Sequence, residues 1–218
     1  MYNTPISHEA YDRNFETNHD LTSTYSISFS HTLEDCCVGI VDMVNSTKIS
    51  TMLGNYQTSR YYEIFLNSMA KIIFTFGGVV IKNMGDCLLY YFPESSKQST
   101  ESRLIHCMEL GLAMIENHEI VCNALKKENL PNVDYRVSID YGNVILMRLN
   151  SSSSIDIIGS PINICSKINR YAQPNEIVIG GDLHERIRCF DNYRFQEVSG
   201  FSLGFKVAYL AYTIKRSD

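Results

Sequence analysis

Two apolar stretches of the sequence each end in an aspartate. A Val-Gly-Ile-Val run at residues 38–41 leads into Asp42, and a Val-Val-Ile run at residues 79–81 leads through a short polar turn to Asp86. A carboxylate at the mouth of a buried strand is costly to desolvate unless it has a partner, and two carboxylates can share a divalent cation. The pair therefore predicts a metal site that serves phosphoryl chemistry.

The residues after Asp42 add a predicted anion site. Ser46 and Thr47 follow closely, and residues 48–53 read as a short helix that stops at a glycine. Ser or Thr at a helix start caps free N–H groups, and those groups together with the helix dipole attract phosphate. No Gly-x-x-x-x-Gly-Lys-Ser/Thr run exists, so this is not a Walker loop. Taken singly, Asp42 also reads as a surface strand end and Ser46 as a plain cap.

Composition indicates an ordinary globular protein without a broad basic surface. The chain has 218 residues, a formal net charge of -5 and a pI near 5.7, so we expect no nucleic acid partner. Its seven cysteines lack paired zinc spacing and are expected to be reduced, mostly core residues of a cytoplasmic protein. No run approaches the roughly 20 apolar residues that cross a bilayer, so no membrane partner is expected.

Hydrophobic periodicity divides the chain into a polar N-terminal extension, residues 1–31, and one folded domain, residues 32–218. Helices are predicted over 61–74, 100–126, 161–172 and 183–187, and strands over 79–82, 87–92, 135–140, 144–147, 155–158, 177–179, 193–198 and 206–213. Because residues 135–140 end near Gly142, we expect residues 144–147 to be a separate partner strand. Long helices interleaved with strands indicate an α/β (α+β) ferredoxin-like sandwich, with helices packed on a mostly antiparallel sheet.

Four segments, in this order, resemble the motifs of the class III nucleotidyl cyclases, the adenylyl and guanylyl cyclase catalytic domain. They are Val41–Thr47, Ile81–Asp86, Arg136–Gly142 and Ile155–Lys167. The resemblance runs from about Cys37 to Tyr212, which is nearly the whole predicted domain. It implies a fold of this family and an enzyme that makes a cyclic nucleotide from a nucleoside triphosphate.

Carried over position by position, the resemblance assigns the residues around the first two motifs. Asp42 and Asp86 would hold two Mg²⁺ or Mn²⁺ ions, with the carbonyl of Met43 as a further ligand. One ion would lower the pKa of the ribose 3′-hydroxyl while the other holds the triphosphate. The backbone at Ser46 and Thr47 would cradle the phosphates.

The resemblance also assigns phosphate, base and ribose contacts. Arg136 would clamp the phosphates through its fork of donors. Lys82 and Asp156 lie where this family reads the base: a lysine donates to N1 of adenine and a carboxylate accepts from the 6-amino group, which favours ATP over GTP. Asn163 would orient the ribose. Taken singly, Arg136 also reads as an exposed strand residue, and Lys82 as a solvated turn residue.

The sequence departs from the family pattern at two positions. Four residues after Asn163 the family commonly has an arginine that stabilises charge on the α-phosphate, but this chain has Lys167, which lacks the bidentate fork. Arg170, nearly one turn further, is a candidate to compensate. The basic residue near the C-terminal glycine is also missing, and Lys206 is the nearest candidate.

In this family the metal aspartates and the base-reading residues of one site come from opposite subunits. Both sets are present on this chain, so we expect a head-to-tail homodimer with two equivalent sites and an inactive monomer.

The leading hypothesis is an adenylate cyclase that converts ATP to cyclic AMP and pyrophosphate, and three alternatives stay open. Tyr56 and Arg60 resemble a Tyr-x-x-x-Arg pattern of bacterial pyrimidine cyclases, associated with UTP or CTP, although such a pair also interacts on any helix. A guanylyl cyclase is a further choice of base. The third alternative is a degenerate nucleotide-binding regulatory module, motivated by Lys167 and opposed by the retention of both aspartates.

Overall fold

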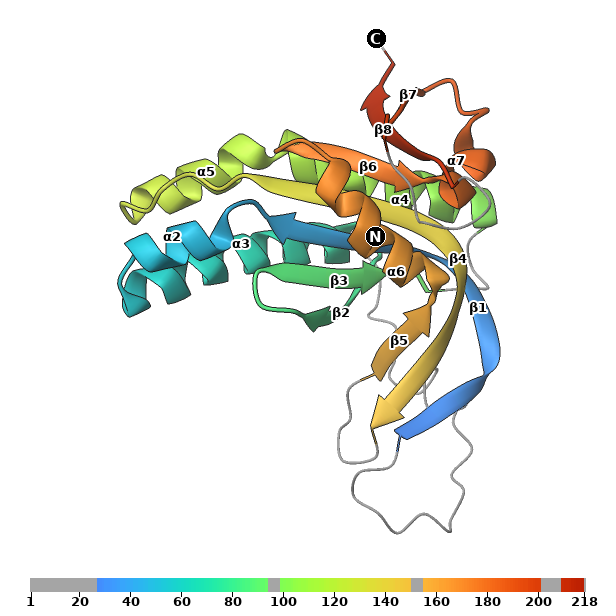
Figure 1. Ribbon diagram of the computed structural model, residues 1–218, viewed down its shortest axis with the longest axis horizontal. Helices are drawn as coiled ribbons and strands as arrows, with labels where there is room; N and C mark the ends of the chain where they lie inside the picture. Colours follow the sequence, from blue (N-terminus) through green and yellow to red (C-terminus); the bar gives the residue numbers. More distant parts are fainter. Residues whose placement is uncertain (1–26, 94–98, 150–154, 201–208, 218) are drawn as a thin grey trace, which may run out of the picture.

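The computed structural model describes residues 27–93, 99–149, 155–200 and 209–217, and these form one sheet with helices on both faces (Figure 1). The strands are β1 (Ile27–Met43), β2 (Val79–Asn83), β3 (Cys87–Tyr91), β4 (Tyr135–Leu149), β5 (Ile155–Gly159), β6 (Glu176–Gly180), β7 (Tyr193–Glu197) and β8 (Ala211–Arg216). The helices are α2 (Ser46–Met52), α3 (Asn55–Thr75), α4 (Thr100–Glu116), α5 (His118–Lys127), α6 (Ser160–Ile168), the 3₁₀ turn η1 (Asn169–Tyr171) and α7 (Gly181–Ile187).

The sheet of the described residues has the strand order β2-β3-β1-β4-β6-β8-β7, and β5 pairs with β4. Within these pairs, β4 and β6 run parallel and the others run antiparallel. The predicted α/β class with a mostly antiparallel sheet is confirmed.

The long strands β1 and β4 form the spine of the sheet, and beyond the helices they continue as a curved ribbon that β5 joins (Figure 1). The prediction of two separate strands around Gly142 was wrong. Gly142 pairs with Cys36 within one unbroken β4, because its neighbours on both sides keep their partners in β1. β1 starts at Ile27, ahead of the boundary predicted at residue 32, because residues 27–29 pair with the end of β4.

Most of the core lies on one face of the sheet, under α3, α4 and α5. α3 contributes Tyr61, Phe65, Met69 and Ile73, which recur every four residues and are fully buried. Burial of each such side chain contributes about 1.5–3 kcal/mol. A smaller core on the opposite face joins alternate residues of β1 and β3 to Cys165 of α6. α6 therefore covers the face that the other long helices leave open (Figure 1).

Two predicted helices are shorter than expected. The helix predicted over 100–126 is interrupted at Asn117, whose side-chain Nδ2 donates to Ala113 O over 2.8 Å and whose backbone leaves the helical conformation. A side chain that bonds its own preceding turn competes with the helix in this way. The helix predicted over 161–172 ends as α6 at Ile168 and tightens into η1.

All seven cysteines are free thiols, and six are buried, as expected for core residues; Cys189 is exposed. Among the residues that the structure describes, no helix is both long and apolar enough to cross a bilayer. The predicted extension up to residue 26, and Lys206, lie outside the described residues.

A glycine in β1 makes room for a buried ring, and this gives a test of the packing. Gly39 lies opposite Tyr90 of β3, and a Cβ added at Gly39 would overlap the Tyr90 ring. We expect Gly39→Ala to lower the free energy of unfolding by about 1–3 kcal/mol, measured by urea denaturation. Gly54→Ala is the control, because its Cβ position has no described neighbour within 4 Å; its expected change is below about 1 kcal/mol. Equal losses in the two variants would contradict this packing.

Candidate active site

Asp42 lies at the end of β1, beside Arg136 of β4 and Cys87 of β3. The preceding residue, Val41, packs into the larger core under α3 and α4. Because side chains alternate along a strand, Asp42 and its cross-strand neighbours face the other side of the sheet, which carries α6. Asp42 is therefore half-buried at the end of the smaller core, with one cation beside it.

Asp86, just before β3, is tied to the end of β1. The Met43 N–H donates to the Asp86 carbonyl over 3.3 Å, and the Ser46 hydroxyl donates to Oδ2 of Asp86. Gly85 adopts a φ of 84°, a conformation that favours glycine, in the turn that leads into Asp86. Strand pairing thus brings both predicted aspartates to the same end of the sheet.

The pKa of the Asp42 carboxyl group is raised above its ordinary value. Burial, and next the negative charge of Asp86, raise the pKa of Asp42 to about 6, while Arg136 opposes this rise. Like charges raise each other's pKa when they share a site. A cation bound between the two carboxylates would favour the charged form of Asp42 and so offset both effects.

The donor set fits a hard divalent cation. Carboxylate and carbonyl oxygens are the ligands that Mg²⁺ and Mn²⁺ prefer, and Mg²⁺ is commonly held by one or two carboxylates plus substrate phosphates and water. Within the described ranges no cluster of three or more His, Cys, Asp or Glu side chains is arranged to hold a metal ion. Asp42 and Asp86 would therefore need oxygens such as the Met43 carbonyl, phosphate or water to complete the coordination.

The interpretation of Ser46 as a helix cap was wrong. Asn45 is the N-cap of α2, with a left-handed φ of 59° and no side-chain cap bond, and Ser46 is the first helical residue. Its hydroxyl goes to Asp86 instead. Thr47 lies exposed in the same first turn.

One hydrogen-bond donor of the Arg136 guanidinium is buried without an acceptor among the described residues. This donor is the Nε–H group. A buried donor without a partner is costly, so a bound anion would satisfy it. Arg136 pairs with Asp42 in the register of β1 and β4, so the phosphate clamp predicted from the sequence lies beside the predicted metal residues.

Lys82 and Asp156, the predicted base-reading residues, form an ion pair. Lys82 Nζ of β2 lies 2.5 Å from Asp156 Oδ2 of β5, across 74 residues of sequence. Their side chains are 42% and 28% exposed, and the other carboxylate oxygen of Asp156 accepts the Ile157 N–H over 2.8 Å. The pair is open to solvent, and therefore to a ligand.

Asn163 and Lys167 lie on the exposed side of α6. The opposite side holds the helix to the sheet, where the buried Cys165 thiol donates to the Val38 carbonyl over 3.3 Å. The Lys167 side chain is exposed but is not without a partner in this chain.

Sequence reasoning missed Asp134, which supports the turn after Asp42. Its carbonyl accepts the Val44 N–H over 2.8 Å, and its side chain accepts from Asn175 Nδ2 over 2.7 Å. Asp134 therefore fixes the segment directly after the predicted metal ligands. No local pattern could have found it, because the contact depends on the pairing of β1 with β4.

Arg60, half of the predicted Tyr-x-x-x-Arg pair, is engaged within the chain. Its guanidinium bonds both carboxylate oxygens of Glu128, over 2.9 and 2.5 Å, and also bonds Glu63 over 2.6 Å. Tyr56 is 76% exposed. Through its bonds to Glu128, Arg60 connects α3 to the C-terminal end of α5 within the same chain.

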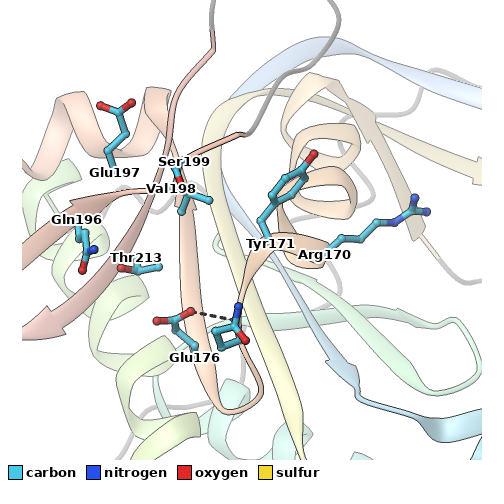
Figure 2. A pocket seen from close by; sticks show the side chains of 9 residues that line it. Arg170, Tyr171, Glu176, Gln196, Glu197, Val198, Ser199 and Thr213 are labelled. Atoms are coloured by element: carbon cyan, nitrogen blue, oxygen red, sulfur yellow. Dashed lines mark hydrogen bonds between the residues drawn. The ribbon is translucent and has the colours of Figure 1, made fainter.

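A polar surface cavity of about 410 Å³ lies between η1 and the strands β6, β7 and β8 (Figure 2), and Arg170 is the one residue singled out from the sequence that lines it among the described residues. Its lining comes from Arg170, Tyr171, Gln173, Glu176, Gln196, Glu197, Val198, Ser199 and Thr213. Asp42 and Arg136, the pair Lys82–Asp156, and Asn163 with Lys167 instead lie in separate groups outside this cavity.

Comparison with known proteins agrees with this fold. The sequence profile of the adenylate and guanylate cyclase catalytic domain matches residues 29–216. The adenylyl cyclase CyaB from P. aeruginosa superposes with a TM-score of 0.77 at 20% identity, over 86% of this chain and 96% of that one. The guanylyl cyclase Cya2 gives 0.72 at 18% identity, over 84% and 92%.

A cytidylate cyclase from Staphylococcus aureus is 21% identical over 191 residues, which is 85% of this chain and 44% of that protein. The chain thus spans less than half the length of this curated relative. These similar proteins are described as acting on different bases, whereas the profile covers nearly all of the described sheet and helices. The chain belongs to the family of adenylate and guanylate cyclase catalytic domains, the class III nucleotidyl cyclases.

Proposed function

We propose that this chain converts ATP to cyclic AMP and pyrophosphate at two equivalent sites of a homodimer. The observation that carries the choice of ATP is the ion pair of Lys82 and Asp156, which presents a donor and an acceptor side by side. Adenine offers the matching edge, since its N1 accepts and its 6-amino group donates. Guanine and uracil carry an oxo group beside a protonated ring nitrogen and would face this pair with both roles reversed.

CTP is the second candidate. Cytosine has an unprotonated N3 next to a 4-amino group, so its edge repeats the pattern of adenine. The similarity to a protein described as a cytidylate cyclase favours this base as well. Lys82 and Asp156 thus select an amino-substituted base, and the distance from the ribose to that edge, longer for a purine, decides between the two.

The residues beside the strand ends act on the phosphates. Asp42, Asp86 and the Met43 carbonyl would hold two divalent cations, which supply charge neutralisation and lower the pKa of the 3′-hydroxyl. Arg136 binds phosphate oxygens, and Asn163 hydrogen-bonds the ribose. The 3′-oxygen loses its proton to solvent and bonds to the α-phosphorus, while the bond to the bridging oxygen breaks and releases pyrophosphate.

A dimer would combine these groups across an interface. Lys82, Asp156 and Asn163 of one subunit would read the base and ribose of a nucleotide whose phosphates lie on Asp42 and Arg136 of the other. Each chain carries both sets, so a two-fold symmetric pair has two complete sites.

Product analysis tests the choice of base. Purified protein is incubated separately with ATP, CTP, GTP and UTP in the presence of Mn²⁺, and the products are separated by chromatography. We expect cyclic AMP from ATP as the main product. Cyclic CMP as the main product would show that CTP, not ATP, is the preferred substrate. Cyclic GMP or cyclic UMP would contradict the proposed base reading. Nucleotide binding without any product would instead support a regulatory module.

Mixing two inactive variants tests the shared site. Asp42→Ala removes a metal ligand and Lys82→Ala removes a base contact, so a mixed dimer keeps one intact site. Random mixing should restore about a quarter of wild-type turnover, since half of the dimers are mixed. Asp42→Ala with Asp86→Ala is the control, because both variants damage the same half and no mixed dimer is repaired. Recovery in the control, or none in the test mixture, would contradict the arrangement.

The raised pKa of Asp42 predicts how stability depends on pH. Between the ordinary value of 3.8 and about 6 the folded chain holds more protons at Asp42 than the unfolded chain, so stability falls as pH rises through this window. Without metal at pH 7.5, Asp42→Asn should therefore resist urea better than wild type, and the difference should shrink near pH 4. Mn²⁺ should stabilise wild type and not the variant. Equal stabilisation of both proteins by Mn²⁺ would place the ion elsewhere.

A further inference from the structure

The exposed side of α6 carries a line of polar and basic side chains that continues into η1. Asn163, Lys167 and Arg170 are exposed and lie four and three residues apart. At 100° per residue Asn163 and Lys167 lie about 40° apart around the axis of α6, and Arg170 follows Lys167 by three residues, in the 3₁₀ turn η1. The residues between them that face the sheet are buried, namely Ile164, Cys165, Ile168 and Asn169. A ligand that reaches Lys167 would therefore meet Arg170 one turn further along.

Arg170 differs from the other arginines of the described residues in having no partner there. Arg60, Arg188 and Arg216 form ion pairs with glutamates, and Arg186 lies 4.0 Å above the ring of Tyr141. Arg103 donates to Thr100, Arg136 interacts with Asp42, and Arg148 and Arg194 have contacts of their own. No hydrogen bond, ion pair or ring contact to a described residue is found for Arg170.

The cavity next to η1 does not account for Arg170 either. Figure 2 shows the Arg170 guanidinium extending away from Glu197, Gln196 and Thr213, the cavity residues of β7 and β8. The Glu176 carboxylate, on the floor of this cavity, accepts the Gln173 N–H over 2.9 Å. The charge of Arg170 thus remains unneutralised by the described part of the chain.

We propose that Arg170 binds the phosphates of the nucleotide beside Lys167 and stabilises the negative charge that develops on the departing pyrophosphate. This inference rests on the proposed function. Lysine is a point charge, whereas a guanidinium donates two parallel hydrogen bonds to phosphate oxygens. Arg170 would supply the fork that Lys167 lacks, from η1, which directly continues α6.

Steady-state kinetics with the preferred nucleotide tests this role. Arg170→Ala should lower kcat by about 100-fold and change KM by less than about threefold, because charge that develops during bond breaking is stabilised more than the bound substrate. Arg170→Lys should retain an intermediate rate. Lys167→Arg in the Arg170→Ala background should recover at least about tenfold, since it returns a guanidinium to the same face. Melting temperatures measured in parallel confirm that each variant is folded.

Arg188→Ala is the matched control, because Arg188 is an exposed arginine at the end of α7 that pairs only with nearby Glu185 among the described residues. Its kcat should equal that of wild type. A second readout is complementation: Arg170→Ala mixed with Asp42→Ala should regain activity, because Arg170 acts on the other subunit's metal site.

The outcomes separate the two proposals. A wild-type chain that makes no cyclic nucleotide overturns the proposed function and this inference with it. An active wild type with an equally active Arg170→Ala variant overturns only the inference. Loss of activity without recovery by either Lys167→Arg or complementation also overturns it, since the arginine would then act neither as a fork on this face nor across the interface.

Discussion

The repulsion between the carboxylates of Asp42 and Asp86 is the constraint on which the rest of the site depends. The Met43 N–H bond to the Asp86 carbonyl holds the two segments together, so neither aspartate can move away without breaking the end of the β1–β3 pairing. Ser46 and Arg136 offset part of the charge, yet burial, and next the charge of Asp86, keep the pKa of Asp42 raised. The sheet therefore stabilises an arrangement that is unfavourable without a cation, as expected for a site arranged in advance for one.

The long pairing of β1 with β4 fixes the positions of Asp42 and Arg136. Val41 and Val137 are opposite each other and both are fully buried beneath α3 and α4, so a slip of one residue would expose both. The next pair along the same register is Asp42 with Arg136. The burial of Val41 and Val137 thus fixes the register that places Asp42 beside Arg136, although partial burial of these two charged side chains is itself unfavourable. The same logic explains the two cores, because one face of each strand packs on α3 to α5 and the other on α6.

The sequence predicted well those features that local pattern determines. Apolar runs located the strand that carries Asp42 and the two strands on either side of Asp86, and the four-residue spacing in α3 located its buried face. It failed where tertiary contacts decide. Gly142 reads as a strand end, but the pairing of β1 with both sides of it keeps β4 continuous. Ser46 reads as a cap, but Asp86, 40 residues away, accepts its hydroxyl.

The family resemblance supplied the candidate residues of the site, but not the way in which the fold positions them. Lys82 and Asp156 are 74 residues apart, and no periodicity in either strand indicates that they form an ion pair. Asp134 shows the same limit, since its carbonyl contact to Val44 arises from chain geometry rather than from side-chain type. Residue type predicts chemistry, whereas the register of distant strands determines which groups meet.

The distribution of charge on the α6 side of the sheet completes the argument for a triphosphate ligand. The whole chain has a formal net charge of -5, so a polyanion gains nothing from its average field. Arg136 nevertheless faces this side, and Lys82 pairs with Leu89, a member of the smaller core there. Lys167 lies exposed on α6, which covers the same face, and Arg170 lies exposed on η1, which follows α6. An acidic chain that collects cations on one face, beside two aspartates suited to hold metal, has the electrostatics that a metal-bound nucleotide requires.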